Sequence, residues 1–202
     1  GVLIWDLKDP ENPELLSHWK TGGDGTHRNY YDGGRYIYAT GLPEGYQGNI
    51  LQIIDIDDPR NPVEVGRWWM EGQHIAGGED PAPRGVMLHG GAYVKGDRAY
   101  LPYSSGGFVV LDISDKTNPI KISDLPFCPP FQTFIAVHTA VPLQDRDLVI
   151  VNSEAIKENC EEPLGYAGIV DVSDEENPRL ASLFPLPVPP EDAPYRTFCE
   201  RG

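Results

Sequence analysis

Residues 50–69, ILQIIDIDDPRNPVEVGRWW, decide the fold of this chain. The stretch has an apolar, β-branched run, then a polar turn with proline, then a second strand-like run from Val63. Proline fixes φ near its turn value and donates no ladder hydrogen bond, while Asp and Asn side chains fold back onto nearby amides. The stretch therefore predicts a β-hairpin whose turn is held by Asp55 and Asn61.

The same pattern occurs four times along the chain. Each copy has an apolar run that ends in Asp, followed six residues later by the Asn of an Asn-Pro pair. We predict structural turn roles for Asp6 and Asn12, Asp55 and Asn61, Asp112 and Asn118, and Asp171 and Asn177. Successive Asp residues lie 49, 57 and 59 positions apart, which is long enough for a four-stranded antiparallel sheet. Calcium binding by the acidic turns is the alternative, but they lack the glycine and distal glutamate of an EF-hand loop.

Two further strand-like segments precede each of the last three copies. A hairpin turn and an arginine separate the two segments, at Arg35, Arg98 and Arg146. One repeat is therefore four strands. We expect one β-propeller segment over residues 1–202, with a partial set of strands and three complete sets. Their approximate ranges are 1–20, 26–70, 88–125 and 137–184, with 185–202 as a proline-rich connection to a further blade.

The repeat pattern resembles a known family. The motif apolar-Asp-[Ile/Val/Leu]-x-Asp-x-x-Asn-Pro at Asp55, Asp112 and Asp171 is similar to the LVIVD repeat of β-propeller proteins. This resemblance implies an all-β propeller, here about three and a half four-stranded blades of a longer ring. The copy at Asp6 departs from the motif. Trp5-Asp6 also suggests a tryptophan-aspartate repeat, but that dipeptide occurs in one copy of four and no Gly-His pair precedes it.

Charge and composition exclude several classes of partner. The net charge is -15, and no run of Lys or Arg is present to neutralise phosphates, so we expect no nucleic acid partner. No apolar stretch approaches the roughly 20 residues that span a bilayer, so we expect no membrane span in this segment. Three cysteines, Cys128, Cys160 and Cys199, are too scattered for a CxxC metal site. Free or buried thiols and a single disulfide remain open, and so does the compartment.

Three of the five histidines occupy equivalent places, each opening the first strand of its set: His27, His89 and His138. The first strand of a propeller blade lines the central channel, so these imidazoles are expected round one axis near one mouth. Imidazole is a good ligand for transition metals, and three histidines leave positions open for water or substrate. We predict a metal site for one Fe, Cu or Zn ion, with Glu154 as an acceptor that orients an imidazole from the second shell.

Other interpretations of the histidines and of the protein's function remain open. The histidines can instead hold neighbouring blades in register, because repeats copy structural residues as faithfully as functional ones, or they can act as acid-base groups without a metal. The chain lacks GxSxG, HExxH and P-loop signatures, so whether it is an enzyme stays undecided. By fold analogy the layout is similar to carotenoid-cleaving oxygenases and selenium-binding-type thiol oxidases, which points to a small-molecule ligand. The alternative is a non-catalytic scaffold whose long loops, 70–87 and 153–168, bind a protein or glycan.

Overall fold

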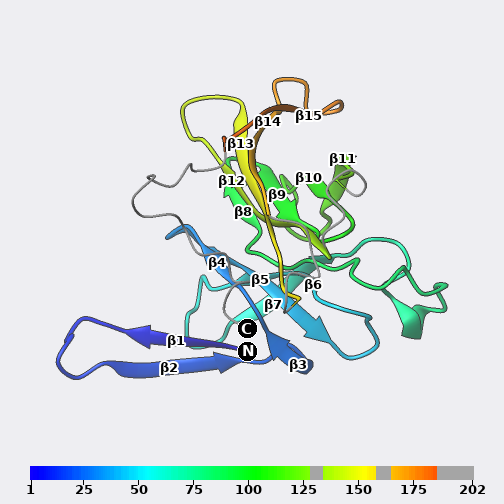
Figure 1. Cartoon of the computed structure of the whole chain (residues 1–202). Helices are drawn as coiled ribbons and strands as arrows, with labels where there is room; N and C mark the ends of the chain where they lie inside the picture. The colour runs from blue at the N-terminus through cyan, green and yellow to red at the C-terminus, as the bar shows by residue number, and fades with distance from the viewer. Residues whose placement is uncertain (128–133, 158–164, 186–202) are drawn as a thin grey trace, which may run out of the picture.

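The computed structural model describes residues 1–127, 134–157 and 165–185. Within these ranges the chain forms antiparallel sheets and one short 3-10 turn, η1 (Ile75–Gly77), as Figure 1 shows. No helix in the described residues is long and apolar enough to cross a membrane. The prediction of an all-β fold is confirmed. The number of blades in a closed ring stays a prediction.

The strands form four sheets, and each sheet is built from consecutive strands of the chain. The first sheet is a hairpin of β1 (Val2–Asp6) and β2 (Glu14–Trp19). The second contains β3 (Gly23–Thr26), β4 (Tyr30–Tyr31), β5 (Tyr36–Pro43), β6 (Ile50–Asp55) and β7 (Val63–Trp68). The third contains β8 (Tyr93–Lys95), β9 (Arg98–Pro102), β10 (Phe108–Asp112) and β11 (Ile120–Leu125). The fourth contains β12 (Ile135–Pro142), β13 (Leu148–Glu154), β14 (Ala167–Asp171) and β15 (Arg179–Leu183).

The repeated aspartate has the same local role in every sheet. Its carboxylate accepts a hydrogen bond from the amide two residues later, at 2.8 Å from Lys8 to Asp6 and 2.9 Å from Asp57 to Asp55. The corresponding distances at Asp112 and Asp171 are 2.8 and 2.9 Å. The pKa of all four aspartates is lowered, mainly by this amide at Asp6 and Asp112. At Asp55 the Arg35 side chain is the larger cause, and at Asp171 the Ser173 hydroxyl is, with the amide adding to each. The turn is therefore closed by the side chain that ends the strand.

Neighbouring sheets contact each other through a position that recurs in the repeat. In each sheet, the residue eleven positions after the repeated Asp contacts a backbone carbonyl of the next sheet. That carbonyl belongs to the residue four positions after the repeated Asp of the next sheet. The Ser17 hydroxyl donates to the Pro59 carbonyl at 2.7 Å, and the Ser123 hydroxyl donates to the Glu175 carbonyl at 2.5 Å. At the junction between them the position is Gly66, where a Cβ would overlap the carbonyl oxygen of Lys116. All three junctions thus require a small residue at this point.

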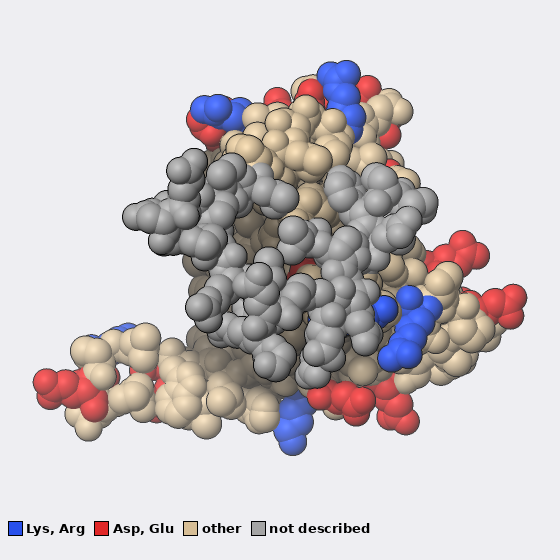
Figure 2. Space-filling model, viewed as in Figure 1, with Lys and Arg blue, Asp and Glu red and all other residues tan. Residues whose placement is uncertain are grey.

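The cores lie between sheets, as expected when each blade buries its faces on its neighbours. One cluster joins the second and third sheets through side chains such as Ile53, Leu101 and Val109. Another joins the third and fourth sheets, with Phe108 and Val151 among its members. On the face drawn in Figure 2, acidic side chains gather at the free tip of the β1–β2 hairpin, and basic side chains are interspersed among acidic ones elsewhere.

Acid should weaken the fold through the turn carboxylates. Arg35 forms an ion pair of 2.6 Å with Asp55. Arg35 and the Asp57 amide together lower the pKa of the Asp55 carboxyl group. Because the folded pKa lies below the unfolded value, this stabilisation is present at neutral pH and is lost as pH falls below about 4. Asp55→Asn should therefore lower the urea midpoint at pH 7 and have a smaller effect at pH 3.

The matched control for this prediction is Asp57→Asn, which makes the same charge change in the same turn. The Asp57 side chain accepts no hydrogen bond from the described residues, so its replacement should leave both midpoints near those of the parent. Equal effects of Asp55→Asn at both pH values would contradict the assigned role of this carboxylate.

Candidate metal centre

The three equivalent histidines lie on the innermost segment of their sheets. The His27 amide donates to the Thr40 carbonyl on β5 at 2.8 Å, and the His89 amide donates to the Pro102 carbonyl on β9 at 3.1 Å. His138 lies on β12, next to Thr139, which pairs with Asn152 on β13. Each histidine therefore opposes the second strand of its own sheet at a similar height.

The fold brings these imidazoles together in one row. The ring centroids of His27 and His89 are 4.7 Å apart, and those of His89 and His138 are 5.0 Å apart. Glu154, the last residue of β13, points its carboxylate at two of them. Its Oε2 is 3.3 Å from Nε2 of His89 and 3.4 Å from Nε2 of His138.

Burial makes the two inner imidazoles poor bases. The side chains of His89 and His138 are 14% and 13% exposed, whereas His27 is exposed. Burial lowers the pKa of both inner histidines, and the neighbouring His27 and His138 lower the pKa of His89 further. Glu154 acts in the opposite direction on both. Both rings are thus mainly neutral near pH 7, which is the form that binds metal ions.

Hydrogen bonding fixes one ring and leaves one nitrogen of each ring unpaired. Nδ1 of His138 lies 2.7 Å from the Thr139 hydroxyl oxygen. Nε2 of His138 and Nδ1 of His89 are buried and have no hydrogen-bond partner among the described residues. If Nδ1 of His138 carries the proton and donates it to Thr139, Nε2 presents a lone pair towards the Glu154 carboxylate. Two acceptors that face each other are stabilised by a cation between them.

The inner segments approach closely because small residues flank the histidines. A Cβ at Gly90, directly after His89, would overlap the carbonyl oxygen of His138. The Thr40 hydroxyl donates to the Gly90 carbonyl at 2.8 Å from the other side. Ser104 continues the contact, since its backbone exchanges hydrogen bonds of 3.1 and 3.2 Å with Val137. These contacts tie the second, third and fourth sheets together at the level of the histidines.

The structure brings together the metal site residues expected from sequence, with one difference in their arrangement. His89, His138 and Glu154 offer ligand atoms that all lie within 4.8 Å of one another. His27 stands beside His89, outside this group. The carboxylate of Glu154 thus faces Nε2 of both imidazoles and belongs to the group of ligand atoms. The sequence instead suggested that it orients one imidazole from the second shell. Thr139 and Gly90 were not singled out from sequence, although each directly follows one of the histidines.

The remaining candidate residues lie elsewhere. Arg35 pairs with Asp55 in its own sheet, and Arg98 bridges to Glu175 of the next sheet at 2.7 Å. Arg146 pairs with its neighbour Asp145. His18 is exposed on β2, and His74 stacks on Tyr46 with ring centroids 4.5 Å apart. The three cysteines, at positions 128, 160 and 199, and most of the proline-rich segment 185–202 lie outside the described residues.

Comparison with known protein families agrees with the repeat seen in the sheets. Residues 45–69 and 91–124 match the family model of the LVIVD repeat. The chain carries LVIVD repeats. The first matched segment ends with the hairpin β6–β7, and the second covers β8 to β10 and most of β11. No curated protein matches this LVIVD-repeat chain.

The close approach at Gly90 gives a prediction. Gly90→Ala should push the His89 and His138 segments apart, because its Cβ meets backbone that cannot rotate away. We expect a loss of about 1–3 kcal/mol in the free energy of unfolding, measured with urea. Gly91→Ala is the matched control, since its Cβ would lie 3.5 Å from the Tyr30 Cβ, an ordinary contact. Equal stability of the two variants would contradict this account of the inner contact.

Proposed function

We propose that this LVIVD-repeat protein binds one transition metal ion, Fe, Cu or Zn, through His89, His138 and Glu154. The observation that carries the proposal is the convergence of two largely buried imidazoles on one carboxylate, with Nε2 of His138 facing that carboxylate without a hydrogen bond. When Nδ1 of His138 donates to Thr139, its Nε2 carries a lone pair that faces the carboxylate without a donor, which costs free energy. A metal ion supplies the missing partner.

The spacing of the ligand atoms supports the proposal. Metal–ligand bonds of about 2.0–2.2 Å in a tetrahedral site place two ligand atoms about 3.3–3.6 Å apart. The two Nε2 to Oε2 distances in the structure, 3.3 and 3.4 Å, fall in this range. Two histidines and one carboxylate are a common set for zinc and for non-haem iron, and imidazole also suits copper. The exposed His27 stands beside His89 as a candidate fourth ligand.

Three protein ligands leave coordination positions open for water or a small molecule. A metal ion in such a site polarises a bound oxygen and lowers the pKa of bound water. Thr139 would hold the His138 ring in one tautomer, and burial would keep both imidazoles neutral. Catalysis at the bound metal ion is a further part of the proposal.

The competing function is a non-catalytic scaffold, for which loop 70–87 offers a surface. The buried Gln73 side chain connects this loop to Tyr103 and to the Gln47 and Asn49 carbonyls.

Metal titration separates these functions. Chelator-treated protein should bind one Zn²⁺ per chain by calorimetry, and Co²⁺ should give the visible absorption of a low-symmetry site. His89→Ala, His138→Ala and Glu154→Gln should each weaken Zn²⁺ binding by at least about 100-fold, because each removes a ligand. His18→Ala is the matched control on exposed β2 and should bind like the parent. If parent and variants bind no Zn²⁺, Co²⁺, Fe²⁺ or Cu⁺ and differ only in stability, the scaffold function stands instead.

Thr139 gives a second prediction for the same site. Thr139→Val keeps the β-branched shape on β12 but removes the hydroxyl that contacts Nδ1 of His138. The ring then loses its orienting partner, so we expect a 10–100-fold loss in Zn²⁺ affinity. The urea midpoint of the metal-free protein should change little. An unchanged affinity would show that this hydroxyl does not position the ring.

A further inference from the structure

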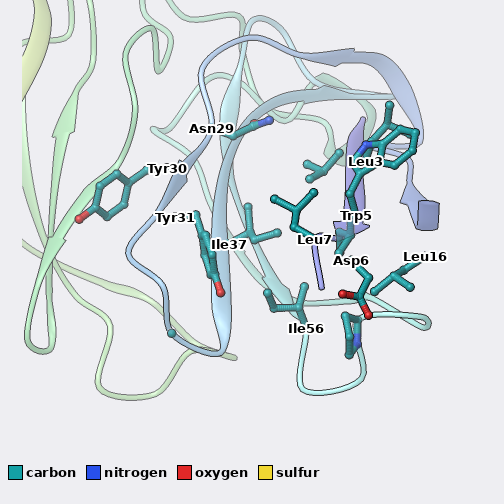
Figure 3. Close-up of a pocket in the computed structure, with 14 residues that line it drawn as sticks. Leu3, Trp5, Asp6, Leu7, Leu16, Asn29, Tyr30, Tyr31, Ile37 and Ile56 are labelled. Carbon is teal, nitrogen blue, oxygen red and sulfur yellow. The ribbon is translucent and has the colours of Figure 1, made fainter. Parts of the chain in front are cut away.

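Two cavities of the structure differ in the charge of their walls. One, of about 720 Å³, lies beside β1, where Figure 3 shows Leu7, Ile37 and Ile56 turned towards one another. Its described lining residues include no Lys or Arg. The other, of about 570 Å³, is lined by Arg84 and by mainly apolar side chains, and we call it the Arg84 cavity. It is bounded by residues 47–48 between β5 and β6, by 82–87 before β8, and by Phe134 before β12. Its volume is that of a small-molecule site.

The walls of the Arg84 cavity are fixed by hydrogen bonds between separate segments. The Gln47 amide donates to the Gln73 carbonyl at 2.8 Å, and Nε2 of Gln47 donates to the Ala82 carbonyl at 2.9 Å. The Ser105 amide donates to the Gly85 carbonyl at 3.2 Å. Gly85 itself has a φ of 95°, which residues with a Cβ rarely adopt. The cavity is therefore formed by the fold without a ligand, as is usual for binding sites of small molecules.

The aromatic wall of this cavity is a departure from the repeat. Phe134 lies four residues before the histidine of its sheet, a position that Gly23 and Gly85 occupy in the two preceding sheets. A Cβ at Gly85 would lie 3.0 Å from Cε2 of Phe134, so the ring takes up the space beside this glycine. Since two glycines hold the same position, the repeat does not require an aromatic residue there. Phe134 instead gives the cavity a flat apolar surface on which a second ring packs well.

Arg84 brings a positive charge that no carboxylate of the described residues neutralises. Within these residues, ion pairs with Asp or Glu are formed by Arg35, Arg60, Arg67, Arg98, Arg146 and Arg179. Arg84 forms none of this kind there, although the net charge of the chain is -15. Its guanidinium carbon lies 6.0 Å from the centroid of the Phe134 ring. Such a cation–π contact leaves N–H donors of the guanidinium available to an anion.

A second donor beside the cavity also lacks a partner. The Ser105 hydroxyl oxygen is buried and forms no hydrogen bond with the described residues. It lies 3.0 Å from the place that a Cβ of Gly85 would take, next to the cavity wall. An unsatisfied buried hydroxyl costs free energy, which an acceptor atom of a ligand would recover. Arg84 and Ser105 both donate hydrogen bonds, so the polar part of the ligand is an acceptor.

We propose that the Arg84 cavity binds a small aromatic monocarboxylate. The carboxylate pairs with the Arg84 guanidinium, and the aromatic ring packs against Phe134 and Met87. One arginine suits a ligand with a single negative charge, whereas the strongly acidic chain repels a polyphosphate. None of the proposed metal ligands lines this cavity, so the site does not depend on the proposed function.

Titration with two simple acids tests the site. Chelator-treated, ¹⁵N-labelled protein is titrated with phenylacetate and benzoate, and with their neutral counterparts phenylacetamide and benzamide. At least one acid should bind once per chain and shift the amide signals of Gly48, Gly85 and Val86. The matching amide should bind at least about tenfold more weakly, because it cannot form the charge-assisted hydrogen bonds with Arg84.

Variants separate the role of the charge from that of the ring. Arg84→Gln should weaken binding of the acid at least about tenfold and remove its advantage over the amide. Because Arg84 is exposed, the urea midpoint should stay near that of the parent. Arg60→Gln is the matched control, with the same charge change at an exposed arginine outside the cavity, and should bind like the parent. Phe134→Leu should weaken acid and amide to a similar extent, since it removes the aromatic wall but not the charge.

The proposal is overturned if neither acid shifts these amide signals at millimolar concentration. It is also overturned if Arg84→Gln binds the acid as tightly as the parent does, or if acid and amide bind the parent equally. In either of these cases the arginine does not recognise the ligand. Zinc binding by His89, His138 and Glu154 is measured separately, so loss of one site leaves the test of the other intact.

Discussion

Neighbouring sheets of this protein contact each other at one recurring point, where a small residue eleven places after the repeated Asp meets a backbone carbonyl of the next sheet. Ser17 and Ser123 satisfy that carbonyl with a hydroxyl, and Gly66 makes room for it. The contact fixes the spacing of the outer strands. With this spacing, the apolar faces pack between sheets, and the inner segments approach until Gly90 touches the backbone of His138.

The histidine row follows from this spacing. Because successive sheets are related by nearly the same step, equivalent residues on their inner segments recur at nearly the same interval, 4.7 Å and then 5.0 Å between rings. The first interval joins an exposed ring to a buried one, and the second joins two buried rings. Burial removes charge from the inner pair, and the Glu154 carboxylate supplies the only acidic group that the described structure brings to both. His89, His138 and Glu154 therefore form the group of ligand atoms on which the proposed metal site rests.

The same repetition explains why β1 differs from its counterparts. Its hairpin with β2 and the contact of Ser17 with the next sheet depend on residues of β1, β2 and the second sheet. Trp5 and Leu7 are exposed, whereas their counterparts Leu111 and Ile113 are buried in the core between the second and third sheets. An exposed sheet edge is a template for pairing, and proteins usually cover or charge such an edge.

Much of the fold follows from sequence because its signals are local. Asp and Asn-Pro at fixed spacing predict the hairpin turns, alternating turns and apolar runs predict the antiparallel strands, and the position of each histidine in the repeat predicts that the three side chains are equivalent. The matches to the LVIVD family model fall on these same hairpins. Glu154 is a candidate from sequence as an acceptor that orients an imidazole, but its distance from the imidazoles is not accessible from sequence.

The sequence by itself determined the repeat, the all-β class and the equivalence of His27, His89 and His138, since each depends on residues a few places apart. Tertiary structure alone decided which histidines are buried, which ring nitrogens lack a partner, and that one carboxylate meets both inner rings. The physical reason is that burial, desolvation and side-chain distance depend on how the sheets pack against each other, and residues far apart in the chain set that packing.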